Sequence, residues 1–366
     1  MKINHICFIL PSLDSSLNSM RDSGGGAETQ LLNFSENLAY QGQKVSIITK
    51  QKSKSNKNRA RNKNIQIFSL PFNYLGGSNF YLFFDWFLLI RLILKIGPDV
   101  VVLKHPRHLI FILAITCFLS GKKFYFHAAI DKDIDLKLIF NEPLIARVLY
   151  KAGLKLVTGI FAQTIHQVNA FKRLTNVDVH YLPSVYSKLI VADNINSIKR
   201  PFILWVGSNS FRKRPHIFKD IAFQYPHLSF VMIYSIGDGT GGIDENHGPP
   251  NLIYIASCPR EKIGSYYCKA EFLISTSALE GFPNTFLESW YFKKPVLSLE
   301  VDPDGIIKKY KLGIVAKDLN SFYRKFEILI NDKKLRNKLG QNGRKYIDSV
   351  HNPENVIPKF LNIINH

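Results

Sequence analysis

The chain has 366 residues, a length that suggests two domains. Hydrophobic residues make up 46% of it and aromatic residues 13%, which is enough to fill ordinary cores and excludes a globally disordered protein. Lysine and arginine number 48 against 28 aspartates and glutamates, and the net charge of +20 favours an anionic partner: a nucleic acid, an acidic membrane surface or a phosphorylated small molecule.

The four cysteines show neither paired nor regular spacing, which argues against a disulfide framework or a zinc site and favours a reducing compartment. The N-terminal MKINHICFILPS has one lysine and a short apolar run without a small-residue cleavage site, so we interpret it as a first strand rather than a signal peptide. The longest clean apolar run, residues 109–120, falls short of the roughly 20 residues that a transmembrane helix needs. These features are typical of a cytoplasmic or membrane-peripheral protein.

Short apolar runs alternate with helical patterns along the first half of the chain. Helices are predicted over residues 27–40 and 80–96, where apolar residues recur at helical spacing. Alternating strands and helices indicate a mostly parallel α/β sheet. The strands predicted here, each expected to be buried on both faces, are 6–10, 45–49, 65–70, 100–103, 123–127 and 159–163.

The periodicity is lost over residues 183–200, and we place an interdomain linker at 191–200. The tail from residue 321 is predicted to be helical, with breaks at Asn352-Pro353 and at Pro358. The expected fold is therefore α/β, with two tandem doubly wound Rossmann-like domains that face a cleft. The strands predicted after the linker are 202–206, 229–234, 252–256, 272–275, 296–299 and 313–315. The predicted domains are 1–190 and 201–350, followed by a tail helix at 351–366.

Two glycine-containing loops are expected at the carboxyl ends of strands, where doubly wound sheets bind their ligands. Segment 23–28 (SGGGAE) opens the first helix, and its glycines let an anion approach the free N–H groups; the alternative is an ordinary flexible loop. It is not a GxGxxG fingerprint, which disfavours a nicotinamide cofactor. Segment 207–215 (GSNSFRKRP) carries three successive cations that suit a diphosphate; the alternative is a solvated surface.

The most specific segment is 280–288 (EGFPNTFLE). A strand is predicted to end near Ser275 and a helix to resume around Pro283, a residue that fits a first helical turn. Glu280 then lies in the loop and Glu288 one to two turns into the helix, both facing the cleft. A carboxylate can accept two hydrogen bonds from a vicinal diol such as a ribose, and free backbone N–H groups can bind phosphate or sugar oxygens.

This segment, within EGFPNTFLESWYFKKPV and flanked by WVGSNSFRKRP and SLEVDPDGII, resembles the retaining glycosyltransferases of family 4. GGGAE near the start, FAQTIHQ and the tail helices agree with this resemblance, which covers nearly the whole chain and is strongest over residues 202–315. The family has the two-domain GT-B fold and an E-x7-E signature. The resemblance implies an acceptor-side first domain, a nucleotide-sugar-binding second domain and C-terminal helices that cross back to the first domain, with the tail helix 351–366 returning to it. It also implies retaining transfer of a sugar from a nucleotide-diphosphate donor to an acceptor glycan.

The resemblance also implies roles for single residues. Glu280 is expected to contact the transferred sugar, His127 to lie near the donor sugar and Lys213 to neutralise the leaving diphosphate, which makes these three the expected catalytic residues. Taken alone, a single histidine such as His127 is more often structural. The expected donor-binding residues are Gly25, Gly26, Arg212, Gly281, Phe282, Pro283, Asn284, Thr285 and, at the ribose, Glu288.

One position departs from the family pattern. Members usually have an arginine directly after the glycine of the phosphate loop, where this chain has Ser208, and Arg212 is the residue that could compensate. Two sequences, Asp131-Lys132-Asp133 and Asp302-Pro303-Asp304, spell the DxD metal motif of the other large glycosyltransferase fold. The tandem architecture does not use this motif, so we expect no metal and no cofactor. Cations and helix N-termini are expected to stabilise the leaving diphosphate instead.

Membrane docking is a further expectation from the charge. The apolar segment 80–96 is interpreted as a buried helix; the alternative is an interfacial helix beside a basic loop. Each cation near an acidic leaflet contributes about 1 kcal/mol, and a lipid-linked acceptor would make such docking useful. The loop carries seven cations and no acid: Lys50, Lys52, Lys54, Lys57, Arg59, Arg61 and Lys63. No RNP, zinc-finger or helix-turn-helix pattern supports nucleic acid as the partner.

The predicted function is that of a metal-independent, retaining hexosyltransferase. We expect it to act from the cytoplasmic side, peripheral on the inner face of the cell membrane, on a lipid-linked glycan of capsule or lipopolysaccharide biosynthesis. One alternative is a sugar-nucleotide epimerase of the same fold, against which the EGFPN segment argues. The other is a catalytically degenerate homologue that acts in membrane assembly or binding, an alternative motivated by Ser208.

Overall fold

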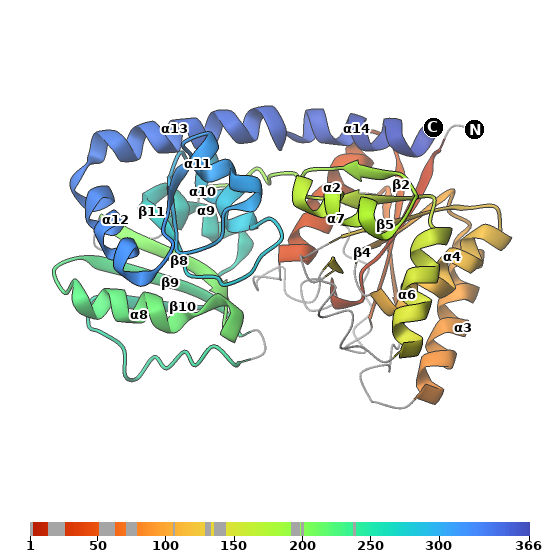
Figure 1. The fold of residues 1–366 in the computed structure, drawn as a ribbon, viewed down its shortest axis with the longest axis horizontal. Coiled ribbons are helices and arrows are strands. Elements are labelled where there is room, and N and C mark those ends of the chain that lie inside the picture. Colours follow the sequence, from red (N-terminus) through yellow and green to blue (C-terminus); the bar gives the residue numbers. More distant parts are fainter. Residues whose placement is uncertain are drawn as a thin grey trace. The chain divides into compact units, whose positions relative to one another are not determined.

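The computed structural model describes residues 3–13, 26–50, 63–70, 79–104, 107–128, 133–134, 144–191, 198, 201–236 and 239–366. By its internal contacts the chain divides into two compact units. The first unit comprises Met1–Asn18, Ala27–Val185 and Pro353–His366, and the second unit comprises Ser19–Gly26 and Tyr186–Asn352. Each unit is built around one parallel sheet (Figure 1).

The sheet of the first unit has seven strands in the order β3-β2-β1-β4-β5-β6-β7, and every neighbouring pair is parallel. Parallel strands need crossover connections, which helices supply here. The strands are β1 (His5–Ile9), β2 (Lys44–Lys50), β3 (Ile65–Leu70), β4 (Val100–Lys104), β5 (Lys123–His127), β6 (Gly159–Ala162) and β7 (Val179–Tyr181). The helices are α2 (Gly26–Tyr40), α3 (Asn79–Ile96), α4 (Ile110–Leu119), α6 (Leu144–Leu156), α7 (Ile165–Leu174) and α14 (Pro353–Asn365), with short 3-10 turns η1 (Pro11–Leu13) and η3 (Arg107–Leu109).

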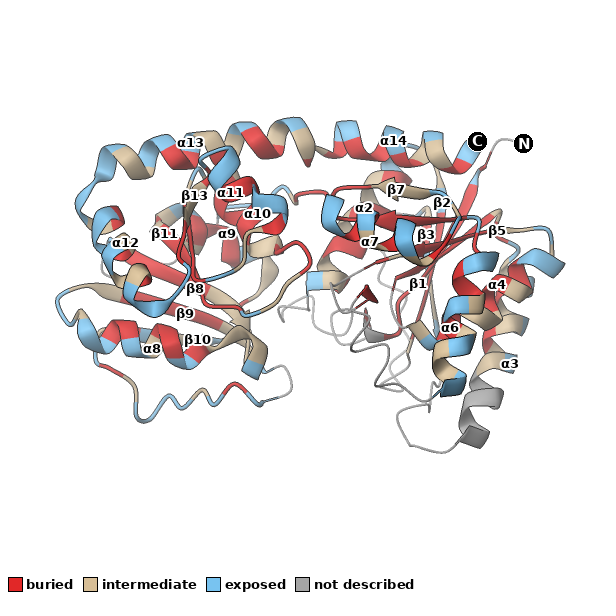
Figure 2. Cartoon of the chain, in the orientation of Figure 1, coloured by how far each residue is buried: buried red, intermediate tan, exposed pale blue. Residues whose placement is uncertain are grey.

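Helices cover both faces of this sheet, because successive strand residues point to opposite faces. Val102 and Tyr125 pack with α2 and with Phe360 of α14 on one face. Val101 and Phe126 pack with α4 and α6 on the other. The inner strands β1, β4 and β6 are therefore buried along their whole length, while the helices expose their outer sides (Figure 2).

The sheet of the second unit has six parallel strands in the order β10-β9-β8-β11-β12-β13. In both sheets the first strand sits between two later ones, so chain order reverses beside it, and such switch points are where doubly wound sheets bind ligands. The strands are β8 (Phe202–Ser208), β9 (Ser229–Ser235), β10 (Leu252–Ala256), β11 (Ala270–Ser275), β12 (Val296–Ser298) and β13 (Gly313–Val315). The helices are α8 (Pro215–Gln224), α9 (Arg260–Lys269), α10 (Asn284–Tyr291), α11 (Ile306–Lys309), α12 (Leu319–Asn331) and α13 (Lys333–Val350), with the turns η5 (Phe211–Lys213) and η6 (Pro303–Gly305).

The predicted fold class, two doubly wound α/β sheets in tandem, is confirmed, and each predicted strand is present close to its expected bounds. β7 was not predicted, because three residues are too few to show a period. The expectation that β3 is buried on both faces is wrong: it is an edge strand with one neighbour, and most of its residues are at least partly exposed.

The predicted break at Asn352-Pro353 is confirmed, but the break predicted at Pro358 is wrong, since Pro358 lies inside α14. An interior proline costs a helix about 3 kcal/mol. Burial of Ile357 and Phe360 in the core of the first unit offsets that cost.

The apolar segment 80–96 forms α3 as predicted, but it is not buried all round. In its described part Leu89 and Ile93 are buried, whereas Phe87 is 60% and Leu94 is 52% exposed, because only one side of the helix meets the sheet. Across the described ranges, no helix combines the length and the apolar character that crossing a membrane requires. The four cysteines carry free thiols.

Candidate active site

The loop after β8 forms one part of the site in the second unit. A Cβ atom at Gly207, the last residue but one of β8, would lie 2.7 Å from the indole of Trp205, so any side chain there would displace the indole. Trp205 Nε1 donates a hydrogen bond to Thr276 Oγ1 (2.9 Å), and that hydroxyl donates to the carbonyl of Lys213 (2.7 Å). These bonds tie the η5 backbone to the residues that follow β11. Ser208 Oγ is turned into its own loop, 3.1 Å from Ser210 Oγ.

Lys213 and Glu280 are brought together. The ammonium of Lys213 pairs with Glu280 Oε1, and the two side chains are only 16% and 11% exposed. A pair this far from water is stronger than a surface ion pair, and either charge left alone would be poorly solvated. The structure thus unites two of the three residues that were predicted to be catalytic.

The other two cations of the loop differ from each other. Arg214 has a left-handed backbone (φ 49°) that joins η5 to α8. Its guanidinium donates to the Thr276 carbonyl (2.6 Å) and pairs with Glu300 (2.8 Å), so it serves the fold. Arg212 is half-buried, its carbonyl accepts from the Ala278 N–H (2.9 Å), and its guanidinium makes no ion pair with any described residue.

Glu288 lies on α10, which begins at Asn284 with Pro283 as its N-cap, one residue later than predicted. Gly281, Phe282 and Pro283 are buried in the approach to the helix, and Asn284 and Thr285 are half-buried in its first turn. Free N–H groups at a helix start are donors for an anion, as the sequence predicted for this segment.

The carboxylate of Glu288 is 7% exposed and forms an ion pair of 2.6 Å with Arg260, the first residue of α9. A second guanidinium nitrogen of Arg260 donates to Ser187 Oγ (2.8 Å). Burial, and after it the neighbouring Glu288 carboxylate, raises the pKa of Tyr267 well above its ordinary value. Glu288 therefore has a fixed orientation inside the second unit.

α13 packs against α10 and fixes its position. Trp290 is fully buried, and its Nε1 donates to the Leu312 carbonyl (2.9 Å). Gly343 of α13 faces this indole so closely that a Cβ atom there would overlap it. The close approach of the two helices fixes the position of Glu288 relative to the sheet.

A second polar cluster lies at the carboxyl ends of β4 and β5 in the first unit. Lys104 and His127 end these strands and are register partners, so their side chains lie on the same face of the sheet. His127 is half-buried, and its Nε2 is shielded from solvent without a hydrogen-bond partner among the described residues. Burial, reinforced by the charge of Lys104, lowers the pKa of His127 well below its ordinary value.

Lys104 itself is 2% exposed. Its Nζ donates to Gln30 Oε1 (2.8 Å), and Gln163 Nε2 donates to the same oxygen (3.0 Å). Gln30 Nε2 donates in turn to Ser184 Oγ (2.7 Å). Burial lowers the pKa of Lys104 to about 7, although the carboxylate of Glu28 opposes this shift. Within the described part of the chain Lys104 makes no ion pair.

Several predicted residues lie outside the described part of the chain. They are Gly25, the first two residues of Asp131-Lys132-Asp133, and the basic loop except Lys50 and Lys63. Gly26 is described and begins α2. Asp302 Oδ1 accepts from the N–H of Ile307 (2.8 Å), a helix-capping role. The described residues contain no group of three or more histidines, cysteines, aspartates or glutamates that could hold a metal ion.

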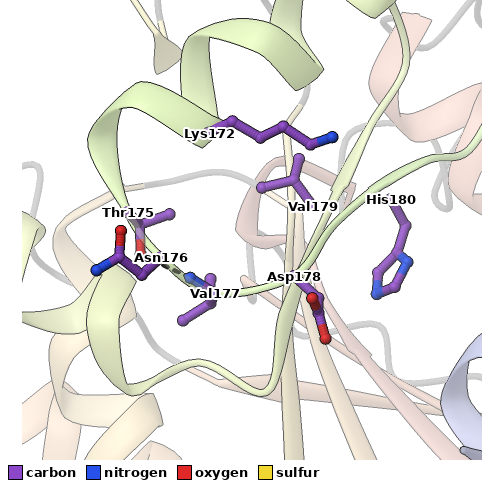
Figure 3. A pocket seen from close by; sticks show the side chains of 7 residues that line it. All are labelled: Lys172, Thr175, Asn176, Val177, Asp178, Val179 and His180. Carbon is purple, nitrogen blue, oxygen red and sulfur yellow. Dashed lines mark hydrogen bonds between the residues drawn. The ribbon is translucent and has the colours of Figure 1, made fainter.

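A pocket of 390 Å³ lies elsewhere in the first unit, where α7 ends and β7 begins (Figure 3). It is lined by residue 172 and residues 175–180, none of which was predicted to belong to the site. Asp178 and His180 from β7 and the loop before it lie on one side, and Lys172 of α7 lies across from them.

Arg260 and the cluster of Lys104, Gln30 and Gln163 were not predicted from the sequence. A usable signal was present for two of them. Lys104 closes an otherwise apolar strand, VVVLK, at its carboxyl end, and Arg260 follows β10 at the same edge of its sheet. Both cations therefore lie where a doubly wound sheet binds its ligands, like those of segment 207–215.

Two family models match the chain: one described as Glycosyltransferase Family 4 over residues 24–183, and one described as Glycosyl transferases group 1 over residues 194–346. A comparison with curated proteins found no match. Sucrose-phosphate synthase from Thermosynechococcus elongatus is similar in structure, with a TM-score of 0.78 at 14% identity over 99% of this chain and 98% of that one.

Two further solved structures are similar. HepE from Anabaena, solved with UDP and glucose, has a TM-score of 0.71 at 13% identity, with 99% of each chain covered. WaaG, a glycosyltransferase involved in lipopolysaccharide biosynthesis, has a TM-score of 0.68 at 15% identity, with 98% of this chain and 99% of that one covered. At these identities the likeness shows the fold.

Proposed function

The chain belongs to the glycosyltransferases of the group 1 and family 4 type and has their GT-B fold, and we propose that it transfers a sugar from a nucleoside-diphosphate sugar to an acceptor glycan with retention of configuration. The observation that supports this proposal most is the arrangement of Lys213, Glu280 and Glu288 around the loop that leads into α10. Cation and carboxylates there match what a diphosphate, a sugar and a ribose require.

Glu288 is proposed to hold the ribose of the donor. A carboxylate can accept a hydrogen bond from each hydroxyl of a vicinal diol. The pair with Arg260, itself bound to Ser187, holds that carboxylate in one orientation before the donor arrives.

Lys213 and Glu280 are proposed to act together at the leaving group. When the donor binds, Lys213 exchanges Glu280 for a diphosphate oxygen, which leaves Glu280 to accept from a hydroxyl of the sugar. The ammonium then stabilises the negative charge that grows as the bond between sugar and phosphate breaks. Arg212 makes no ion pair in the described part of the chain and is therefore a second cation available to the diphosphate. Ser208, at the position where family members usually have an arginine, carries no charge.

In the proposed reaction the acceptor oxygen bonds to the anomeric carbon as the phosphate leaves, and the acceptor proton passes to a phosphate oxygen. We propose that no metal and no cofactor take part, because the cations of η5 neutralise the diphosphate. The family resemblance suggests that the first unit contributes His127 at the donor sugar and Gly25 and Gly26 at the diphosphate.

The acceptor is proposed to be lipid-linked, in cell-surface polysaccharide biosynthesis, with the enzyme peripheral on the inner face of the membrane. The start of α6 supports this part of the proposal, because Leu144, Ile145 and Val148 are 67%, 73% and 57% exposed (Figure 2). Lys151 and Lys155 follow on the exposed side of the same helix. An apolar helix start beside basic residues suits an acidic lipid surface.

The test is transfer itself. We expect the purified protein to move labelled sugar from one nucleotide sugar of a panel into the lipid fraction of a membrane extract, with the anomeric configuration retained by proton NMR. Nucleotide binding without transfer by the wild-type protein would favour the degenerate homologue. Interconversion of the donor sugar without an acceptor would favour the epimerase.

A further inference from the structure

We propose that Lys104, fixed by Gln30, is a positioning residue that keeps the imidazole of His127 uncharged and so presents it to sugar hydroxyl groups as one donor and one acceptor. The inference rests on the proposed function, because it takes His127 to lie near the donor sugar. It concerns only the first unit. Its first part, that Lys104 keeps His127 uncharged, can be tested without any measurement of activity.

The backbone places the two side chains together. β4 and β5 are parallel, and their last residues, Lys104 and His127, are register partners. Side chains of such partners lie next to each other on one face of the sheet. On this face the residues before them, Val102 and Tyr125, belong to the apolar core against α2 and α14. The two polar groups therefore close the end of an apolar column, where water screens them little.

Gln30, which binds Lys104, does not neutralise the charge of the lysine. Gln30 Oε1 accepts from both Lys104 Nζ (2.8 Å) and Gln163 Nε2 (3.0 Å), which fixes the ammonium without neutralising it. A carboxylate at position 30 would form a salt bridge instead. Because residue 30 is an amide, the positive charge of Lys104 still acts on the neighbouring imidazole.

The groups that face this cluster decide its proton states. Among the described residues the charged groups are Glu28 from α2, Lys104 from β4 and His127 from β5. On the same face β6 contributes the ring of Phe161, 6.2 Å from the imidazole, and β1 contributes the apolar Phe8. Any pH low enough to protonate His127 lies below the pKa of Lys104, which burial lowers to about 7. Lys104 is thus already charged, and a second positive charge beside it is disfavoured.

An uncharged imidazole has a use at a sugar. It offers one N–H donor and one lone-pair acceptor, and hydroxyl groups can satisfy both. The imidazolium has two donors and no acceptor. His127 Nε2, which is shielded from solvent and has no partner among the described residues, is the atom whose role would change on protonation.

Histidine titration by NMR tests whether Lys104 keeps His127 uncharged. The chain has 11 histidines, so His127 is assigned by comparison with the His127→Gln spectrum. In the wild-type protein we expect His127 to protonate only well below the ordinary range of a histidine, because of burial and then of the Lys104 charge. Its ring resonances should also change slightly near pH 7, where Lys104 titrates. In Lys104→Met the protonation of His127 should move upward by about one pH unit or more.

Two further variants keep the test decisive. Gln30→Glu is nearly isosteric, and its carboxylate should neutralise Lys104 and raise the pKa of His127 in the same direction. Lys123→Met removes a charge at the opposite end of β5, where Nζ bonds the Ile364 carbonyl (2.9 Å), and should leave His127 unchanged. Wild-type titration of His127 near pH 6.5, or equal titration in the wild-type, Lys104→Met and Gln30→Glu proteins, would overturn the proposal.

The pH dependence of activity tests whether the reaction needs an uncharged His127. The ratio of kcat/KM at pH 8 to that at pH 6 should be near one for the wild-type enzyme as far as His127 is concerned. In Lys104→Met it should rise by the factor that the measured protonation of His127 at pH 6 predicts. A uniform loss at all pH values would point to a merely structural role. If no transfer is found under any condition, the proposed function fails, while the NMR titration still decides whether Lys104 sets the state of His127.

Discussion

Replacing Lys213 with methionine removes the cation of the Lys213–Glu280 pair and keeps most of the length of the side chain. Because the two side chains are 16% and 11% exposed, the Glu280 carboxylate is then left with little water and no cation. Removing one partner of a fully buried pair lowers the free energy of unfolding by about 3–5 kcal/mol, and the partial exposure here reduces the expected loss to about 1–3 kcal/mol. For a unit of this size the melting temperature falls by about 2–4 °C per kcal/mol.

A double-mutant cycle separates the pair from the loss of each side chain. Urea unfolding, followed by circular dichroism, is measured for the wild-type protein, Lys213→Met, Glu280→Gln and the double variant. We expect the double variant to be more stable than the sum of the single effects predicts, by about 1 kcal/mol or more. Additive effects within about 0.3 kcal/mol would refute the reasoning, because they would show that the two charges do not stabilise each other.

The same variant addresses catalysis. If Lys213 stabilises the leaving diphosphate, its loss should lower kcat by about 100- to 1,000-fold, as for other groups that stabilise a developing negative charge. Lys213→Arg keeps the charge and should recover part of that loss. A kcat for Lys213→Met within about threefold of the wild-type value would remove Lys213 from the proposed mechanism.

Three further predictions concern the packing and the buried charges. Gly343→Ala should lower the free energy of unfolding by about 1–3 kcal/mol, since its Cβ overlaps the Trp290 indole; equal urea midpoints would contradict this. Arg260→Met should lower it by about 1–3 kcal/mol, measured in the same way, because Glu288 is then buried without its cation; no change would show that the pair is not stabilising. Lys104→Met should stabilise the protein by about 1–3 kcal/mol at pH 6, because it removes a buried charge. The pKa of Lys104 falls from 10.5 to about 7 on folding, so the unfolded chain binds more protons between these values and wild-type stability rises with pH. The advantage of Lys104→Met should therefore shrink between pH 7 and pH 10, and a pH-independent difference would contradict the argument.

Much of the fold could be predicted because its strands are short apolar runs between helical patterns. The predicted strand 123–127 coincides with β5, whereas β7 was missed because three partly exposed residues carry no pattern. Pro358 misled the prediction of the tail, because the sequence shows the missing N–H but not the core that the helix joins.

Less of the site could be predicted, for a physical reason. Lys213 and Glu280 were expected at one ligand because the family resemblance assigns both to the sugar donor, and the structure pairs their side chains. Arg260 meets Glu288 from another helix, a contact that depends on tertiary packing. Lys104 was missed because a lysine at a strand end usually reaches water, and only the structure shows it buried against Gln30.

Nucleotide binding tests the central claim most directly. Thermal unfolding is measured with UDP, GDP, ADP, dTDP and CMP for the wild-type protein and for Glu288→Ala. A ligand at about 100 times its Kd stabilises the folded state by about 2.7 kcal/mol, which is a readable shift for a protein of this size. We predict a shift with one nucleoside diphosphate that is lost in Glu288→Ala. The absence of a shift with any nucleotide, in a protein shown to be folded, would contradict the assignment of a nucleotide-sugar donor site to the second unit.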